Sequence, residues 1–552
     1  MQREKKHLDT QSIFHRPDYD ETTPVLIVGG GLVGLSTALF LSWHGISSLL
    51  VERHPGTAIH PRATGFAPRT MEMFRTVGVE AAIRQVEPPV PQDSNLPLVE
   101  SLVGQEFDCL QEDISSLFSG PVPGSAIAQD VLEPVLRARA EQLGGDLRFG
   151  TELVAFEQDR EGVTATIRER ASGNTCTVRA QFLVAADGSQ SRVRQQLGIG
   201  QRGAASLFHV VSMIFEADIM ELFRKRHAVM CFLANDSIAS GALVPYPGSS
   251  ARPDVFRLDV GYDPEEETLA DYPEARCLQL IRAAVGIPDL PVRIKAVLTY
   301  EAVALVADRF QQGRAFLVGD AARAQPPSGG LGGNTGIAEA HNLAWKLAAV
   351  LRGEAGEALL ATYDAERRPV ADYTAEQTAL LSQQRATEGS AGVTVDPVVV
   401  NTGYCYREGA IVREAGDENL PLAQRPDQWK GEPGTHAPYI VFEREGKSIS
   451  TLDLFGAHFV LLVGPDGQQW KSAAHSVQEA LHVPLDIYQI GGEAADLIDT
   501  GNTFCDAYGI TAAGAALVRP DGFIGWRSQG AGEKEQDAEQ ALTQALSTLL
   551  FC

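Results

Sequence analysis

The stretch TPVLIVGGGLVGLSTALFLSWHGISSLLVER, Thr23 to Arg53, carries the pattern that decides the fold. Apolar Val25–Val28 predicts a short buried strand, a helix is expected through about His44, and a second strand, Ser48–Val51, ends at Glu52. The turn after the first strand has the spacing G-x-G-x-x-G, formed by Gly29, Gly31 and Gly34. Strand, glycine turn, helix, second strand and terminal acid together predict the βαβ unit of a dinucleotide-binding fold.

Each residue of this motif has a separate physical task. Gly29 permits the tight turn, Gly31 lets the helix N-terminus approach a pyrophosphate, and Gly34 lets helix and strand pack closely. Unpaired N–H groups and the positive end of the helix dipole receive the phosphate charge. Glu52 follows the last glycine by 18 residues, near the usual offset of about 20, and is expected to accept the ribose hydroxyls. Because NAD and FAD both contain adenosine diphosphate, this motif does not separate them.

Two later strand-and-turn segments indicate a flavin. FLVAADGSQSRVR places Asp187 after an apolar strand, and RAFLVGDAARAQPPSGGLGGNTG places Asp320 after another. At the end of its strand, Asp320 is positioned to hydrogen-bond a polyol such as a ribityl chain. Residues 326–330, PPSGG, include Pro327 and lack two backbone N–H groups, so this segment is expected to lie flat against a ring.

A helix follows the second of these segments directly. We expect it to begin at Asn334 or Thr335 and to end at Gly353, because apolar residues recur between them at a helical spacing of three and four. A reduced flavin carries negative charge at N1 and C2=O, which a helix N-terminus stabilises. The glycines before the helix would let the flavin ring lie against the backbone.

With these motifs in order, the sequence resembles the class A flavoprotein aromatic hydroxylases, which share the para-hydroxybenzoate hydroxylase fold. The resemblance covers about residues 22–400 and includes AHNLAWKL and YDAERRP. Arg323 departs from the family, since many members have histidine there. Aromatic-polyketide hydroxylases tolerate arginine at this place, which favours a bulky polycyclic substrate.

The resemblance also implies roles for individual residues. Asp320 would contact the ribityl side, Gly333 and Asn334 would meet the pyrimidine end through backbone N–H groups, and Arg62 and Gln129 match an arginine and a glutamine that the family uses. The predicted FAD-binding residues are Gly29, Gly31, Gly34, Glu52, Arg62, Gln129, Asp187, Asp320, Pro327, Gly333 and Asn334.

The predicted fold class is α/β: a Rossmann-like FAD-binding domain with an inserted β-sheet substrate domain, followed by a C-terminal domain that resembles thioredoxin. Alternating apolar runs between the second and third flavin segments indicate the inserted sheet, and there Tyr246 is a candidate for the substrate pocket. The expected parts are a flexible arm (1–21), a discontinuous FAD-binding domain (22–200 and 300–400), a substrate-binding sheet (201–299), a linker (401–435) and a thioredoxin-like domain without CxxC (436–552).

Composition excludes several other classes. A net charge of −25 disfavours nucleic acid and anionic membranes, because phosphate binding needs clustered Lys and Arg. The seven cysteines are scattered and never form CxxC, so we expect no disulfide framework and no metal. Cys505 is solitary, so a structural or dimer-contact role is favoured over thiol redox chemistry for the last domain. No long apolar run occurs, and a cytoplasmic protein is expected.

The resemblance implies a monooxygenase that uses FAD, NADPH or NADH, and O2. A flavin C4a-hydroperoxide would pass one oxygen atom to an aromatic, polycyclic phenol. Two alternatives stay open: a Baeyer–Villiger or epoxidising enzyme on the same fold, and a flavin-holding protein that serves assembly rather than turnover. Sequence reasoning names no catalytic base, and a homodimer is one expected state.

Overall fold

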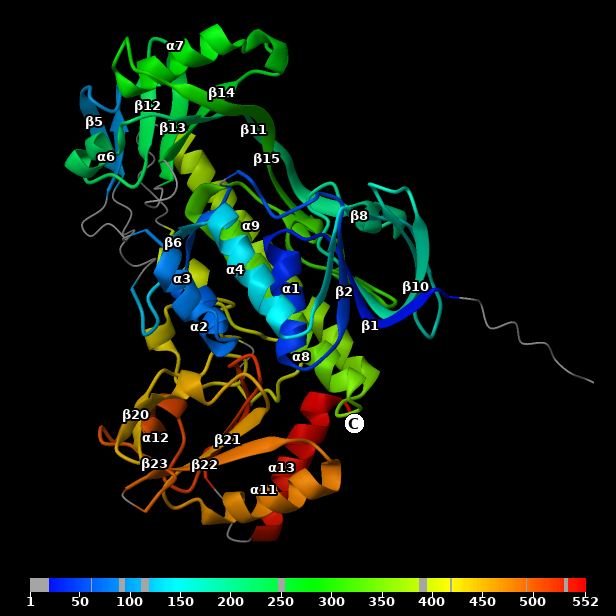
Figure 1. The fold of residues 1–552 in the computed structure, drawn as a ribbon. Helices are drawn as coiled ribbons and strands as arrows, with labels where there is room; N and C mark the ends of the chain where they lie inside the picture. The colour runs from blue at the N-terminus through cyan, green and yellow to red at the C-terminus, as the bar shows by residue number, and fades with distance from the viewer. Residues whose placement is uncertain are drawn as a thin grey trace, which may run out of the picture.

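Three large β-sheets follow one another along the long axis of the molecule (Figure 1). The structure, a computed structural model, describes residues 19–60, 62–88, 95–110, 119–246, 254–386, 395–416, 419–492, 494–530 and 535–552. Residues 1–18 of the predicted N-terminal arm lie outside the described residues. The arm is shorter than predicted at its other end, because Glu21 already pairs with Val178 in the first sheet.

The first sheet contains the predicted βαβ unit. Its strand order is β16-β17-β10-β1-β2-β7, with β9 pairing β10 and β8 pairing β9, and β17, β10, β1, β2 and β7 run parallel. Helix α1 ends at Trp43, one residue before its predicted end, and β2 includes Glu52. The strands are β1 (Glu21–Val28), β2 (Ser48–Glu52), β7 (Asp146–Phe149), β8 (Thr151–Gln158), β9 (Val163–Glu169), β10 (Thr175–Ala185), β16 (Gln311–Gln312) and β17 (Ala315–Leu317).

Helices bury the apolar strands of this sheet in one core. Helix α1 lies between α4 and α8, and α9 runs beside α8 toward the second sheet (Figure 1). A two-stranded ladder of β3 and β6 lies near α2 and α3. These elements are α1 (Leu32–Trp43), α2 (Pro68–Thr76), α3 (Glu80–Val86), α4 (Gln129–Gln142), α5 (Arg192–Gln196), α8 (Leu331–Leu351), α9 (Thr362–Ala386), α10 (Pro397–Thr402), β3 (Thr64–Phe66) and β6 (Ser125–Ala128).

Helix α8 begins earlier than predicted, at Leu331 rather than at Asn334 or Thr335. Gly329 and Gly330 have φ of 76° and 66°, a left-handed conformation that favours glycine, and the helix starts as soon as the chain leaves them. At the other end, Gly353 has φ of 74° directly after the C-cap, as predicted for a helix stop.

The second sheet lies at the upper end of the molecule in Figure 1, with strand order β18-β15-β11-β14-β13-β12-β4-β5. It is wider than residues 201–299, because β4 pairs in parallel with β12 and brings β5 with it. The elements are β4 (Leu96–Val99), β5 (Glu106–Leu110), β11 (Gln201–Glu216), β12 (Cys231–Asn235), β13 (Ile238–Tyr246), β14 (Val255–Tyr262), β15 (Arg293–Ala307), β18 (Arg323–Ala324), α6 (Met220–Arg226) and α7 (Glu274–Val285).

Residues on the two faces of this second sheet alternate, as expected for strands covered on one side. Val211, Phe256 and Leu258 pack with Ile281 and Ala284 of α7 in a separate core. The opposite face points toward the first sheet and bounds the cavity described below.

The third sheet lies at the lower end of the molecule, with strand order β20-β19-β23-β22-β21-β24-β25. Cys505 lies in α12 as a free thiol, and the likeness to thioredoxin stays a prediction. The elements are β19 (Val441–Arg444), β20 (Lys447–Ser450), β21 (Phe459–Val463), β22 (Leu485–Gly491), β23 (Leu497–Ile498), β24 (Ala515–Val518), β25 (Ile524–Ser528), α11 (Gln468–Leu481), α12 (Phe504–Tyr508) and α13 (Glu535–Leu550).

A buried ionic cluster joins the third sheet to the helices of the first. Arg519, in the turn between β24 and β25, donates from Nη1 and Nη2 to the two carboxylate oxygens of Glu366 on α9, both at 2.8 Å. Lys346 on α8 donates from Nζ to Glu366 Oε2 at 2.8 Å, and Asp521 pairs with Arg519. All four side chains are buried. Such a cluster is strongly coupled, because loss of one partner leaves another charge buried and unpaired.

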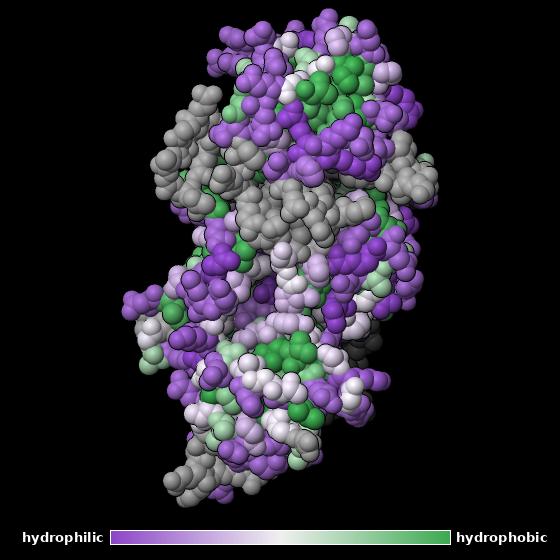
Figure 2. Space-filling view, turned by 90° about the vertical axis from the view of Figure 1, so that its left-hand side faces the viewer, coloured by the Kyte–Doolittle hydropathy of each residue, from purple (hydrophilic) through white to green (hydrophobic). Residues whose placement is uncertain are grey.

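The outer surface is mainly hydrophilic on the face that Figure 2 shows, with hydrophobic residues gathered in small patches. Within the described ranges, no helix is both long enough and apolar enough to cross a lipid bilayer.

Candidate functional site

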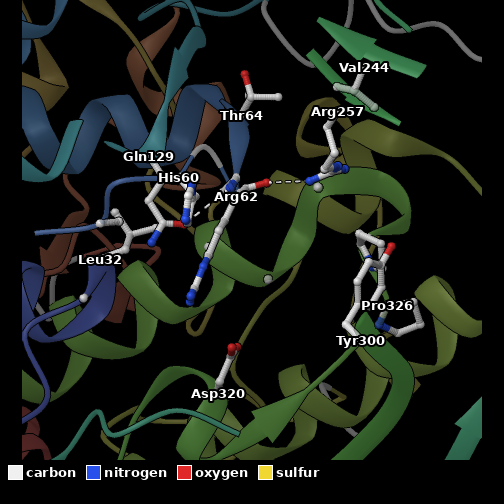
Figure 3. A pocket seen from close by; sticks show the side chains of 18 of the residues that line it. Leu32, His60, Arg62, Thr64, Gln129, Val244, Arg257, Tyr300, Asp320 and Pro326 are labelled. Carbon is white, nitrogen blue, oxygen red and sulfur yellow. Dashed lines mark hydrogen bonds between the residues drawn. The ribbon is translucent and has the colours of Figure 1, made fainter. Parts of the chain in front are cut away.

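A cavity of about 2230 Å³ lies between the carboxyl ends of the first-sheet strands, the N-termini of α1 and α8, and one face of the second sheet. Figure 3 shows it from close by. The cavity brings together every predicted cofactor residue except Gly34, and Tyr246 as well. These lining residues are Gly29, Gly31, Glu52, Arg62, Gln129, Asp187, Tyr246, Asp320, Pro327, Gly333 and Asn334.

The three motif glycines have different surroundings. A Cβ atom on Gly34 would lie 1.9 Å from the carbonyl oxygen of Gly29, and one on Gly29 would lie 2.2 Å from that of Ala186. A Cβ atom on Gly31 would meet only Glu133 Oε1, at 3.9 Å. Gly29 and Gly34 are therefore required by packing, whereas the open side of Gly31 faces the cavity. That open side fits a phosphate at the N-terminus of α1.

Glu52 holds the end of β2 against the glycine turn. Its Oε2 accepts a hydrogen bond from Gly30 N–H at 2.7 Å, and its Oε1 accepts one from His54 N–H at 2.8 Å. A carboxylate has about four acceptor sites, so both oxygens retain capacity for ribose hydroxyls. The backbone bonds orient the carboxylate before a ligand arrives.

Glu133, a residue that the sequence reasoning missed, lies fully buried beside Gly31. Its Oε2 accepts from Ala58 N–H at 2.6 Å, and its Oε1 accepts from Gln129 Nε2 at 2.7 Å. Desolvation raises the pKa of Glu133, and the bonds from Ala58 and Gln129 partly offset that rise. The available signal was its position four residues after Gln129, on the same face of α4.

Gln129 is also held by hydrogen bonds to a neighbouring segment. Its backbone N–H donates to the Ala63 carbonyl at 2.9 Å, and its side-chain oxygen accepts from Ala63 N–H at 3.4 Å. Ala58 and Ala63 are therefore both held against α4, by main-chain and side-chain hydrogen bonds on the cavity side.

Arg62 and Asp320 face each other across the lower part of the cavity, as Figure 3 shows. Asp320 is exposed to the cavity, yet the surrounding protein raises its pKa by desolvation, which Arg323 and Arg62 partly oppose. The two side chains are not hydrogen-bonded to each other, so both retain hydrogen-bonding capacity for a polar ligand between them.

Several buried polar atoms of the cavity wall have no hydrogen-bond partner within the described part of the chain. They include Oδ1 of Asp187, Oδ1 of Asp259, and both polar side-chain atoms of Gln325. Asp187 uses only its Oδ2, which accepts from Val193 N–H at 3.2 Å. Buried polar atoms normally find partners, so these atoms fit a cavity that holds polar ligands such as a dinucleotide.

The N-terminus of α8 opens onto the same cavity without a side-chain cap. Since the helix begins at Leu331, free amides are expected at residues 331–333. The contact of the Gly333 and Asn334 amides with the pyrimidine end of a flavin stays a prediction.

The Asn334 side chain instead connects α8 to the segment of β3 and α2. Its oxygen accepts from Ala67 N–H at 2.9 Å and from the Thr70 hydroxyl at 2.6 Å. Its nitrogen donates to the carbonyls of Gly330, at 2.9 Å, and Gly65, at 3.3 Å. Four bonds from one amide fix the position of the helix N-terminus.

Arg323, which the sequence linked to the substrate class, lies fully buried outside the cavity lining. Its Nε donates to Glu339 Oε1 at 2.8 Å, and its Nη2 donates to the Gly332 carbonyl at 2.7 Å. Glu339 Oε2 accepts from Gly319 N–H at 2.7 Å. Arg323 therefore holds the glycine-rich loop against α8 and does not line the cavity itself.

Tyr246 borders the cavity from β13. Its hydroxyl donates to the Arg62 carbonyl at 3.4 Å, and Arg257 lies over its ring at 5.7 Å from the centroid. Burial raises the pKa of the Tyr246 hydroxyl, so it stays a donor. Arg257 Nη1 also donates to the Arg62 carbonyl, at 3.2 Å (Figure 3). The loop of Arg62 thus connects the cofactor side of the cavity to the second sheet.

Comparison with known proteins gives concordant matches over nearly all of the chain. The model of the FAD binding domain family matches residues 22–378, and that of the aromatic-ring hydroxylase C-terminal family matches residues 430–550. The chain is 43% identical to a 4-methyl-5-nitrocatechol 5-monooxygenase of Burkholderia sp, covering 98% of this chain and 100% of the relative. It is 39% identical to a tetracenomycin A2 monooxygenase-dioxygenase of Streptomyces glaucescens, covering 96% and 97%.

A solved structure resembles this one closely. The ternary complex of aklavinone-11 hydroxylase with FAD and aklavinone has a TM-score of 0.88 and 36% sequence identity, covering 97% of this chain and 100% of that chain.

Proposed function

Because the chain belongs to the FAD-dependent aromatic-ring hydroxylases, we propose that it oxygenates a polycyclic substrate that carries a phenolic hydroxyl. The chain is an FAD-dependent monooxygenase of aromatic compounds, as the sequence resemblance predicted. That its substrate is a polycyclic phenol is the part that we propose. The relatives named above act on a nitrocatechol and on a tetracenomycin, and the solved complex contains aklavinone.

The size and lining of the cavity carry this proposal. One drug-sized ligand usually occupies roughly 300–1,000 Å³, whereas this cavity measures about 2230 Å³. FAD and a substrate of several fused rings would fill such a space together. The wall from the second sheet is largely apolar, with Val210, Ala242 and Val244 on it, which suits a flat aromatic ring system.

We propose that the cofactor lies along the predicted residues. Gly31 and the N-terminus of α1 would hold its pyrophosphate, Glu52 its ribose, Asp320 its ribityl chain, and the free amides at the start of α8 the pyrimidine end. When bound, FAD supplies the redox chemistry, with electrons from NADPH or NADH and an oxygen atom from O2.

The protein's own contribution is placement and exclusion of water. The second sheet covers the cavity opposite the α1 and α8 N-termini, so a substrate on its apolar face would point toward the cofactor side. Tyr246 and Arg257 fix the Arg62 loop from above. This keeps the two sides of the cavity in register.

Turnover of the flavin-loaded enzyme with isotopic oxygen tests the proposal. The purified protein would be mixed with NADPH or NADH, ¹⁸O2 and a panel of polycyclic phenols, and the products analysed by mass spectrometry. We expect one ¹⁸O atom as a new ring hydroxyl. Oxygen inserted into a ring or found as an epoxide would instead support the alternative reactions, and absence of oxygenated product across the panel would contradict the proposal.

The predicted homodimer and cytoplasmic location stay predictions. Size-exclusion chromatography with light scattering tests the first, and fractionation of the native cell tests the second.

A further inference from the structure

A polar cluster interrupts the apolar cavity face of the second sheet. It consists of Arg257 and Asp259 on β14 and Tyr300 on β15, and we call it the Asp259 cluster. Val210 and Val244 lie beside it on the same face. Asp259 is only 8% exposed. Burying a carboxylate in an apolar wall is unfavourable unless it is paired. A carboxylate at this position therefore indicates a functional role.

The two oxygens of Asp259 have unequal surroundings. Oδ2 accepts from the Tyr300 hydroxyl at 3.2 Å and lies 3.2 Å from Arg257 Nε. Oδ1 is buried and has no hydrogen-bond partner within the described part of the chain. Since Asp259 lines the cavity, a ligand with a hydroxyl donor would complete its hydrogen bonding.

The other members of the cluster are donors rather than bases. Burial, together with Asp259, raises the pKa of the Tyr300 hydroxyl, and burial raises the pKa of the Tyr246 hydroxyl beside it. Arg257 stays protonated at all ordinary pH values. Among the groups that face one another here from β13, β14 and β15, only the Asp259 carboxylate can take up a proton.

We propose that Asp259 is the general base of the reaction and that Arg257 stabilises the phenolate it creates, an inference that rests on the proposed function. The proton of a substrate hydroxyl passes to Asp259 Oδ1, and the O–H electron pair stays on the substrate oxygen. The carboxylate becomes a carboxylic acid, and the step involves no oxidation or reduction. The phenolate donates electron density into its ring, which favours transfer of an electrophilic oxygen atom to it.

Two phenols of different acidity test the assignment on the flavin-loaded enzyme at pH 8. The hydroxyl of 4-nitrocatechol is ionised at that pH and needs no base, whereas the hydroxyl of catechol is not ionised. We expect Asp259→Asn to lower kcat/KM for catechol by about 10²-fold or more, the usual size of general-base catalysis. The same variant should retain kcat/KM for 4-nitrocatechol within about threefold, because that step is bypassed.

Two further variants complete the design. Tyr300→Phe leaves the carboxylate but removes its donor, and we expect a smaller loss, also confined to catechol. Glu301→Gln removes a carboxylate from the adjacent position of β15, where the side chain is 46% exposed and does not line the cavity. We expect this control to match the wild-type enzyme with both phenols.

The outcomes separate the two proposals. Equal losses of Asp259→Asn on both phenols, or no loss on catechol, would overturn the role of Asp259 while the proposed function stands. A wild-type enzyme that oxygenates neither these nor any polycyclic phenol would overturn the proposed function, and the base assignment with it.

Discussion

Gly31 and Gly34 stand three residues apart in one motif, and their substitution by alanine should have opposite consequences. The Cβ of Gly34→Ala would lie 1.9 Å from the Gly29 carbonyl, so α1 and β1 could not pack, and we expect loss of soluble protein. Gly31→Ala meets nothing closer than 3.9 Å and has an ordinary backbone φ of −79°. We expect it to fold and to bind FAD at least tenfold more weakly.

Far-UV circular dichroism, thermal melting of the apoprotein and FAD titration separate these two effects. A Gly31→Ala variant with wild-type FAD affinity would show that the phosphate does not approach that residue. The sequence pattern assigned close packing to Gly34 and the phosphate to Gly31, and the surroundings of the two glycines fit that division. The pattern could not predict the contacts with Ala186 and Glu133, because these residues lie far away in the chain.

Glu133 is a second residue whose removal should be measurable. Glu133→Ala leaves the N–H of Ala58 and the Gln129 amide without an acceptor in a buried site. We expect it to destabilise the protein by about 1–3 kcal/mol. Chemical denaturation of the apoprotein gives the value, with Glu141→Ala as control. Glu141 is 45% exposed on the same helix, so its loss should change stability by less than about 0.5 kcal/mol.

At the scale of an element, the N-terminus of α8 depends on one side chain. Asn334→Ala removes three hydrogen bonds that join α8 to the β3 and α2 segment, and a fourth to Gly330 at the start of α8 itself. At about 1 kcal/mol for each bond, we expect a loss of roughly 2–4 kcal/mol and weaker FAD binding. Asn334→Asp keeps the acceptor oxygen, so we expect its stability to lie between those of the wild type and the alanine variant. Chemical denaturation measures the stability, and FAD titration measures the affinity. An alanine variant as stable as the wild type would show that the Asn334 side chain does not stabilise the start of α8.

Helix α8 also shows what a local pattern can and cannot predict. Its apolar spacing and Gly353 predicted its existence and its end. Its start was predicted about three residues late, because Gly332 and Gly333 have poor helix propensity. In the structure, Arg323 from a preceding segment and the Asn334 side chain from the helix itself both hydrogen-bond to this glycine-rich first turn. Helix propensity does not account for such side-chain bonds.

At the scale of the whole molecule, the buried cluster of Arg519, Glu366, Lys346 and Asp521 should give stability a distinct dependence on pH. Desolvation alone would raise the pKa of Glu366, but Arg519 and Lys346 outweigh it and hold the pKa below the ordinary value of 4.5. The folded-state pKa is depressed, so this contribution is fully present above pH 4.5 and is lost as the pH falls below it.

Glu366→Gln should therefore remove several kcal/mol at pH 7, because Arg519 would lose a buried partner, and should flatten the loss of stability on acidification. Melting temperatures of the flavin-loaded enzyme between pH 3 and 7 check both expectations. Glu357→Gln serves as control, since that carboxylate is 67% exposed in a pair with Arg314. A pH profile of Glu366→Gln parallel to that of the wild type would exclude the cluster as the source.

The three-sheet plan followed from the order of motifs, yet long-range pairings lay beyond the sequence. Strands β4 and β5 join the second sheet from far back in the chain, since Leu98 of β4 pairs with Phe232 of β12. The contact of Arg519 with Glu366 spans 153 residues. Neither can be read from local periodicity, since a pattern of two or 3.6 residues describes one element and not its neighbour.

The alternation of side chains along the second sheet has a consequence for the evolution of substrate specificity. Val211 and Leu258 point into the core under α7, while Val210, Ala242 and Val244 point into the cavity. Inherited changes at the first set disturb the packing on which survival of the fold depends, whereas changes at the second set reshape only the space around a substrate. A lineage can therefore exchange one aromatic compound for another by altering every second residue of a strand, and keep the scaffold that its ancestors had.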